Sequence, residues 1–130
     1  MLLIAAVLAT EVHLHRTGAD LIGVHHVRRG NLPVPFDLTF FAYFEIEDER
    51  PGQRFRVHLD LVDPDGHRAT GVRSTATIPE RSEPDIPQRW APSFRIDGAY
   101  QTYGPHEWVL TLDSTVVAER LVHVMRPLDS

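Results

Sequence analysis

Apolar and polar residues alternate with a period of two along most of this chain. Within Gln53–Val62, residues 54–61 alternate strictly between charged or polar and apolar side chains, and Leu38–Glu47 has an apolar face of the same kind. Successive side chains of a β-strand point to opposite faces of a sheet, whereas a helix repeats every 3.6 residues. No segment of about ten or more residues keeps a helical period with caps at both ends. The alternation therefore predicts strands and argues against a helical fold.

Turn residues separate the alternating segments at short, regular intervals, which is typical of all-β domains. We expect an antiparallel β-sandwich, immunoglobulin-like, with roughly seven to eight strands. It forms a single domain over residues 1–130. The predicted turns include Arg16–Asp20, Asp63–Gly66 and Asp113–Thr115. The predicted strands are Met1–Ala9, Leu21–Val27, Leu38–Glu47, Gln53–Val62, His67–Ile78, Ser93–Tyr100, His106–Leu112 and Val116–Met125.

A proline-rich segment, Pro79–Pro92, interrupts the alternation. Its prolines are Pro79, Pro84, Pro87 and Pro92. Proline lacks the backbone N–H that a strand or helix needs for its hydrogen bonds. We expect this segment to form an irregular surface loop between the two sheets.

The chain contains no Cys and no Lys, and this excludes several classes of chemistry. The chain has no Cys, and all 13 of its basic residues are Arg. Without Cys there are no disulfides, thiolate nucleophiles or Cys-type zinc sites. Without Lys there is no Schiff-base chemistry and no P-loop lysine. A net charge of −5, with Arg28-Arg29 as the one short basic run, also argues against a nucleic-acid partner.

The first apolar run, Met1–Ala9, superficially resembles a signal peptide. It lacks the basic residues that open such a peptide, and it is far shorter than the roughly 20 residues that span a bilayer. We interpret the run as a buried first strand. We therefore expect a cytoplasmic protein with no membrane partner.

Four segments in order carry a resemblance to a known family. They are the Ala-rich first strand, Ala19–Val24, Leu61–Gly66 and the closing hairpin after Gly104. Together they resemble a family of small bacterial β-sandwich proteins that is known only as a domain of unknown function, although Asp20 stands where that family has Asn. The resemblance implies the sandwich and no activity.

Histidine is frequent, with eight residues, and two pairs stand out. His13 and His15 are two residues apart, which puts both imidazoles on one side of an extended segment, and His25 and His26 are adjacent. A metal site needs three or four converging ligands, and spacing alone does not show convergence. We therefore expect these histidines to lie at the surface or at a sheet edge, and we predict no metal site. A small-ligand or metal-binding sandwich built on these histidines or on Trp90 is the alternative.

Acidic residues near the predicted Asp63–Gly66 turn offer a second place for a cation. Asp60, Asp63 and Asp65 are spaced so that they can approach one ion. Calcium requires six to eight oxygens, and no second acidic loop of matching pattern is visible. Asp63 and Asp65 are better explained as turn formers.

Nothing in the sequence assembles a catalytic centre. No serine stands in a Gly-x-Ser-x-Gly motif, and no nucleophile, base and orienting residue can be placed together. We expect no enzyme and no cofactor.

The strongest functional signal is a predicted strand that is apolar on both faces. Phe41 and Tyr43 lie opposite its core face, and an apolar outer face needs a cover. Either the Pro79–Pro92 loop or a second chain supplies that cover. Trp90, inside the loop, is the tryptophan without an evident core position. We therefore predict a non-catalytic protein-interaction module that forms a homodimer, or a stable complex with another protein, with Phe41, Tyr43 and Trp90 at the contact.

Overall fold

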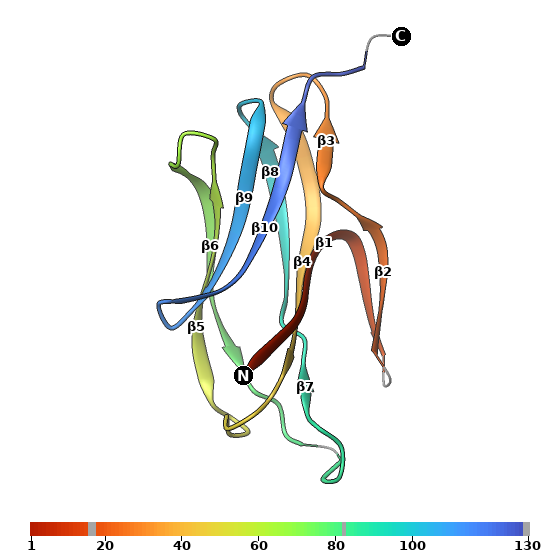
Figure 1. Cartoon of the computed structure of the whole chain (residues 1–130), viewed down its shortest axis with the longest axis vertical. Coiled ribbons are helices and arrows are strands. Elements are labelled where there is room, and N and C mark those ends of the chain that lie inside the picture. Colours follow the sequence, from red (N-terminus) through yellow and green to blue (C-terminus); the bar gives the residue numbers. More distant parts are fainter. Residues whose placement is uncertain (16–17, 82, 129–130) are drawn as a thin grey trace.

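The computed structural model of the chain describes residues 1–15, 18–81 and 83–128, which form ten strands and no helix. The strands make two sheets that lie face to face (Figure 1). The first sheet contains β1 (Leu2–His15), β2 (Gly18–Val24), β4 (Val34–Glu45), β7 (Arg89–Trp90) and β8 (Ser93–Tyr100). The second contains β3 (Val27–Arg29), β5 (Arg54–Val62), β6 (Arg68–Thr77), β9 (Gly104–Leu112) and β10 (Thr115–Met125).

The strand order leaves defined edges on both sheets. The first sheet runs β2-β1-β4, and β7 and β8 both pair with the far side of β4. The second sheet runs β3-β10-β9-β5-β6. Strand β2 therefore forms one edge of the first sheet and β7 and β8 the other, and β3 and β6 are the edge strands of the second sheet.

The chain passes from one sheet to the other at His25 and His26. The backbone N–H of His25 donates to the carbonyl oxygen of Leu8 on β1 at 2.8 Å, and the N–H of His123 on β10 donates to the carbonyl oxygen of His26 at 2.9 Å. Because the chain changes sheets here, β3 runs alongside β10 in the same direction. This β3–β10 pair is parallel, and the other described pairs are antiparallel.

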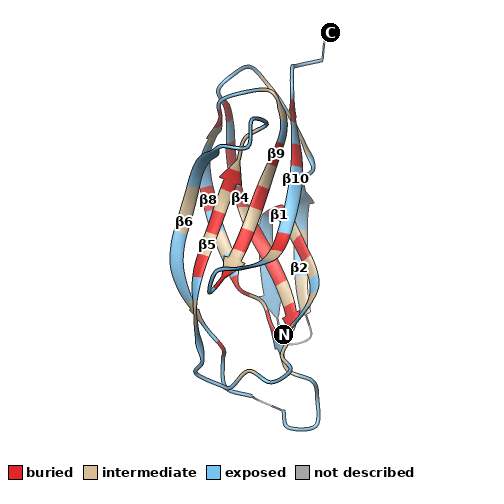
Figure 2. Cartoon of the chain, turned by 60° about the vertical axis from the view of Figure 1, so that its left-hand side comes forward, coloured by how far each residue is buried: buried red, intermediate tan, exposed pale blue. Residues whose placement is uncertain are grey.

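The core lies between the inner faces of the two sheets (Figure 2). Inward side chains of β4 and β1 meet those of β5 and β9, as the period-two pattern requires. The largest side chains with almost no solvent exposure are Trp108, Tyr100, Phe40, Phe44, Leu8, Leu59, Leu61, Ile78 and Leu110. The described residues leave no buried side-chain nitrogen or oxygen without a hydrogen-bond partner.

The predicted all-β sandwich is confirmed, but the number of strands is higher than seven to eight. The segment Leu21–Val27 is not one strand, because the sheet change at His25 and His26 divides it into β2 and β3. The loop Pro79–Pro92 is not wholly irregular, because β7 pairs with β4 at Phe44 and Glu45.

Two other boundaries differ from the sequence prediction. β1 continues past Ala9 to His15, and β4 begins at Val34 instead of Leu38. Of the predicted turn Arg16–Asp20, the last three residues belong to β2, while Arg16 and Thr17 lie outside the described residues. In each case, pairing with a neighbouring strand extends the element beyond the part that alternates most clearly.

The predicted turn before β10 is confirmed as a two-residue hairpin. Asp113 and Ser114 both have positive φ, 47° and 72°, which is the backbone of a type I′ turn. The Asp113 carboxylate accepts a hydrogen bond from the backbone N–H of Arg56 at 2.7 Å. This bond joins the turn to β5.

Candidate functional sites

The outer face of β4 carries Phe41 and Tyr43, the two aromatics predicted to need a cover. Phe41 is only 3% exposed within one chain. It lies cross-strand between Val7 on β1 and Ser93 on β8, and its ring stacks on Tyr43 at 5.9 Å. Tyr43 is half-buried, and the Arg89 guanidinium lies 5.9 Å from its ring centroid. Neighbouring side chains on the same face therefore cover Phe41 within the single chain, and it is not free for the predicted contact with a partner.

Trp90 is also not a surface residue. It is 7% exposed, and its ring packs near those of Phe44 and Phe55, at 5.9 and 5.7 Å between centroids. The side chain of Trp90 on β7 thus belongs to the hydrophobic core. A stacking platform for a ligand on Trp90 is therefore excluded by its burial.

The paired histidines of β1 lie on a surface. His13 contacts the carboxylate of Glu11 at 3.1 Å, and His15 lies 3.5 Å from a carboxylate oxygen of Asp20 on β2. All four side chains are at least 44% exposed. Each imidazole is thus held beside one acid of the same hairpin.

His25 and His26 stand at the sheet change and do not join the first pair. A ring nitrogen of His25 hydrogen-bonds the hydroxyl of Thr10 at 2.8 Å, and burial lowers the pKa of His25. Within the described residues, none of the four predicted histidines belongs to a group of three possible metal ligands.

The turn between β5 and β6 brings two of the three predicted acids together. Possible ligand atoms of Asp63, Asp65 and His67 lie within 4.8 Å of one another. The Asp63 carboxylate accepts the backbone N–H groups of Asp65 and His67 at 3.0 and 2.9 Å, which agrees with the predicted turn-forming role. Asp60 is instead paired with Arg68 at 2.6 Å. His67 was missed by the sequence analysis, although it follows Asp65 at the same two-residue spacing.

A hairpin that leaves the sandwich is the most exposed part of the first sheet. We call residues 10–15 of β1 and 18–24 of β2 the β1–β2 arm (Figure 1). None of these arm residues is buried, whereas Ala9, directly before the arm, has no exposed surface. Leu14, Ile22 and Val24 are 57%, 51% and 55% exposed. The register places Leu14 on one face of the arm and Ile22 and Val24 on the other.

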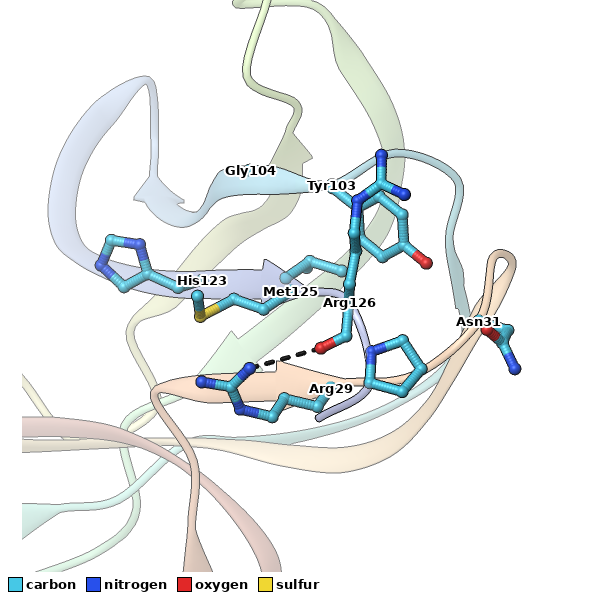
Figure 3. Close-up of a pocket in the computed structure, with 9 residues that line it drawn as sticks. Arg29, Asn31, Tyr103, Gly104, His123, Met125 and Arg126 are labelled. Carbon is cyan, nitrogen blue, oxygen red and sulfur yellow. Dashed lines mark hydrogen bonds between the residues drawn. The ribbon is translucent and has the colours of Figure 1, made fainter. Parts of the chain in front are cut away.

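An open cleft lies at the end of the sandwich where β3 and β10 finish (Figure 3). Its volume is about 910 Å³. The described residues that line it include Arg29, His123, Arg126 and Tyr103 but no acidic residue. Of these residues, the sequence analysis named only Arg29, as part of the short basic run Arg28-Arg29.

Three separate chain segments are tied together around this cleft. A guanidinium Nη1 of Arg29 donates to the carbonyl oxygen of Arg126 at 3.3 Å, and the N–H of Gly30 donates to the carbonyl oxygen of Met125 at 3.1 Å. The Tyr103 hydroxyl donates to the carbonyl oxygen of Gly30 at 3.0 Å. The Arg126 guanidinium lies over the Tyr103 ring, 5.0 Å from its centroid. These contacts hold the cleft walls in place.

None of the described residues belongs to a helix long and apolar enough to cross a membrane.

Comparison with known proteins shows a likeness to solved structures. No protein-family model matches the sequence, and no curated protein matches it. Among solved structures, the chain is similar to an immunoglobulin-like protein from Pseudomonas aeruginosa, with 14% identity and a TM-score of 0.41 over 92% of this chain and 91% of that one. The resemblance to the family of small bacterial sandwich proteins stays a prediction.

Proposed function

We propose that this chain is a non-catalytic interaction module that pairs with a second copy of itself through the β1–β2 arm. The observation that carries the proposal is the exposure of the arm. It projects from the sandwich with apolar side chains on both faces, and its edge strand β2 pairs with β1 on one side only.

An arm of this kind is poorly stabilised by the chain it belongs to. A two-stranded hairpin without a packed face is marginally stable in water. An edge strand presents a row of unpaired backbone N–H and C=O groups, which another strand can satisfy. Burying Ile22 and Val24 against a partner would stabilise the arm further, because each is more than half exposed.

The acidic side chains of the arm already have neighbours within the arm. Glu11 lies beside His13, and Asp20 lies beside His15. What remains for a second chain to satisfy is therefore backbone and apolar surface. Antiparallel pairing of β2 with β2 of a second copy meets both needs under two-fold symmetry.

This placement of the contact differs from the one expected from the sequence. Phe41 and Trp90 are buried in the single chain and are not available to a partner. Tyr43 keeps a partly exposed ring. The proposed contact is therefore Leu14, Ile22 and Val24, with β2 as the pairing strand.

Molar mass in solution tests the proposal. Light scattering behind a sizing column should show a dimer for the wild type at micromolar concentration. Ile22→Lys should shift the chain to a monomer, because a lysine on an edge strand opposes pairing. The dissociation constant should rise at least about tenfold, the change that accompanies about 1.4 kcal/mol.

Leu121→Lys is the matched control. Leu121 is 49% exposed on β10, so the same substitution adds the same charge at a similarly exposed apolar position in the other sheet. This variant should remain a dimer. A monomeric wild type, or equal dissociation by the two variants, overturns self-association through the arm.

A further inference from the structure

Among the described residues, some arginines pair with acids, whereas those at the open cleft do not. Arg68 pairs with Asp60 at 2.6 Å and Arg95 with Asp37 at 3.0 Å. Neither Arg29 nor Arg126 has a carboxylate partner among the described residues. Two positive charges thus stand at one cleft of a chain whose net charge is −5.

Arg29 retains most of its capacity to donate hydrogen bonds. A guanidinium has five N–H groups, and one nitrogen of Arg29 is used on the carbonyl oxygen of Arg126. In the register of β3 and β10, Arg29 lies beside Met125, and His123 is two residues before Met125. Figure 3 shows these three side chains at one end of the cleft, with Arg126 over Tyr103 at the other. The cleft therefore offers cationic and neutral donors beside an apolar thioether.

We propose that this cleft binds a small organic anion, through a phosphate or carboxylate group held by Arg29 and His123. A guanidinium fork matches the geometry of both acid groups, and charge-assisted hydrogen bonds are the strong ones. Met125, 41% exposed, contacts the apolar part of the ligand. The Arg126 guanidinium adds positive potential from its fixed position on Tyr103. The cleft shares no lining residue with the β1–β2 arm.

A nuclear magnetic resonance titration with two probes tests this site and identifies the acid group. Phenyl phosphate and benzoate carry the same apolar ring with the two different acids. At least one of them should give saturable shifts of the backbone amides of residues 29–31, 103–104 and 123–126. Addition of sodium chloride should weaken the binding, because salt screens an exposed ionic contact.

In the variant Arg29→Gln, the affinity for whichever probe binds the wild type should fall about tenfold or more, in line with the loss of a charge-assisted pair. Arg54→Gln is the matched control, since Arg54 is exposed on β5 and the change in net charge is the same. It should change the affinity less than about twofold. If Arg29→Gln loses its dispersed spectrum, Arg126→Gln takes its place, with weaker binding expected.

Two results would overturn the site. One is the absence of saturable shifts with either probe in the wild type. The other is equal weakening by Arg29→Gln and Arg54→Gln, which would mean that the probes respond to overall charge and not to the cleft.

Discussion

Removing the Tyr100 hydroxyl from the core should lower the free energy of unfolding by a measurable amount, because one buried hydrogen bond is lost. The indole N–H of Trp108 donates to the hydroxyl of Tyr100 at 3.2 Å, and both side chains are 1% exposed. Tyr100→Phe keeps the ring, which lies 4.7 Å from that of Phe36, and removes only the acceptor. The indole N–H would then be buried without a partner. That state costs about 1–3 kcal/mol.

Urea unfolding followed by far-ultraviolet circular dichroism measures this cost, since the signal comes mainly from the backbone. Tyr103→Phe is the matched control, because the Tyr103 hydroxyl bonds a carbonyl oxygen in a less buried place. We expect the free energy of unfolding to fall less than about 1 kcal/mol for this control. If Tyr100→Phe stays within about 0.5 kcal/mol of the wild type, the bond does not contribute as reasoned.

Three further stability predictions use the same unfolding assay. Leu59→Ala removes a fully buried side chain of β5 and should lower the free energy of unfolding by about 2–5 kcal/mol. His13→Ala, at an exposed position, should lower it by less than about 1 kcal/mol. Similar values for the two variants would contradict the assigned burial. Ser114→Gly should stabilise the chain by about 0.5–1 kcal/mol, because glycine adopts positive φ without the strain that serine carries there; a loss of stability would argue against the type I′ turn. Burial raises the pKa of Tyr100, so the folded state keeps a proton that the unfolded state loses above about pH 10. Stability should therefore be unaffected by this group below about pH 10 and fall above it, and Tyr100→Phe should remove that part of the decline.

The strands that the sequence predicts best are those with one buried and one solvated face. β5 begins one residue after its predicted start, Gln53, and ends at Val62 as expected. Its burial alternates as its sequence does. Such strands can be recognised from the local sequence, because the side chains that face water are polar and the alternate ones that face the core are apolar.

The elements that sequence analysis missed depend on contacts between distant residues. The chain divides β2 from β3 because His25 bonds Leu8 and His26 bonds His123, and nothing in the local pattern specifies those partners. β7 exists because β4 offers a free side for pairing at Phe44. Local alternation carries no information on either event.

The candidate sites show the same limit. The apolar outer face of β4 was predicted to need a cover from the Pro79–Pro92 loop or from a second chain, yet Phe41 is covered by its neighbours on the sheet. The cleft combines Arg29, Tyr103 and Arg126 from three segments far apart in the sequence. Their convergence depends on the parallel pairing of β3 with β10, which the sequence did not predict.

Hydrogen–deuterium exchange at two protein concentrations tests the proposed pairing of β2 most directly. Edge-strand amides exchange readily when unpaired, and mass action favours the dimer as concentration rises. We expect the amides of residues 18–24 to gain protection between about 1 µM and about 100 µM, while those of the edge strand β6 do not change. In Ile22→Lys, exchange from β2 should be rapid at both concentrations. Exchange from β2 that is the same at both concentrations in the wild type, or protection that appears in β6 instead, would contradict pairing through the β1–β2 arm.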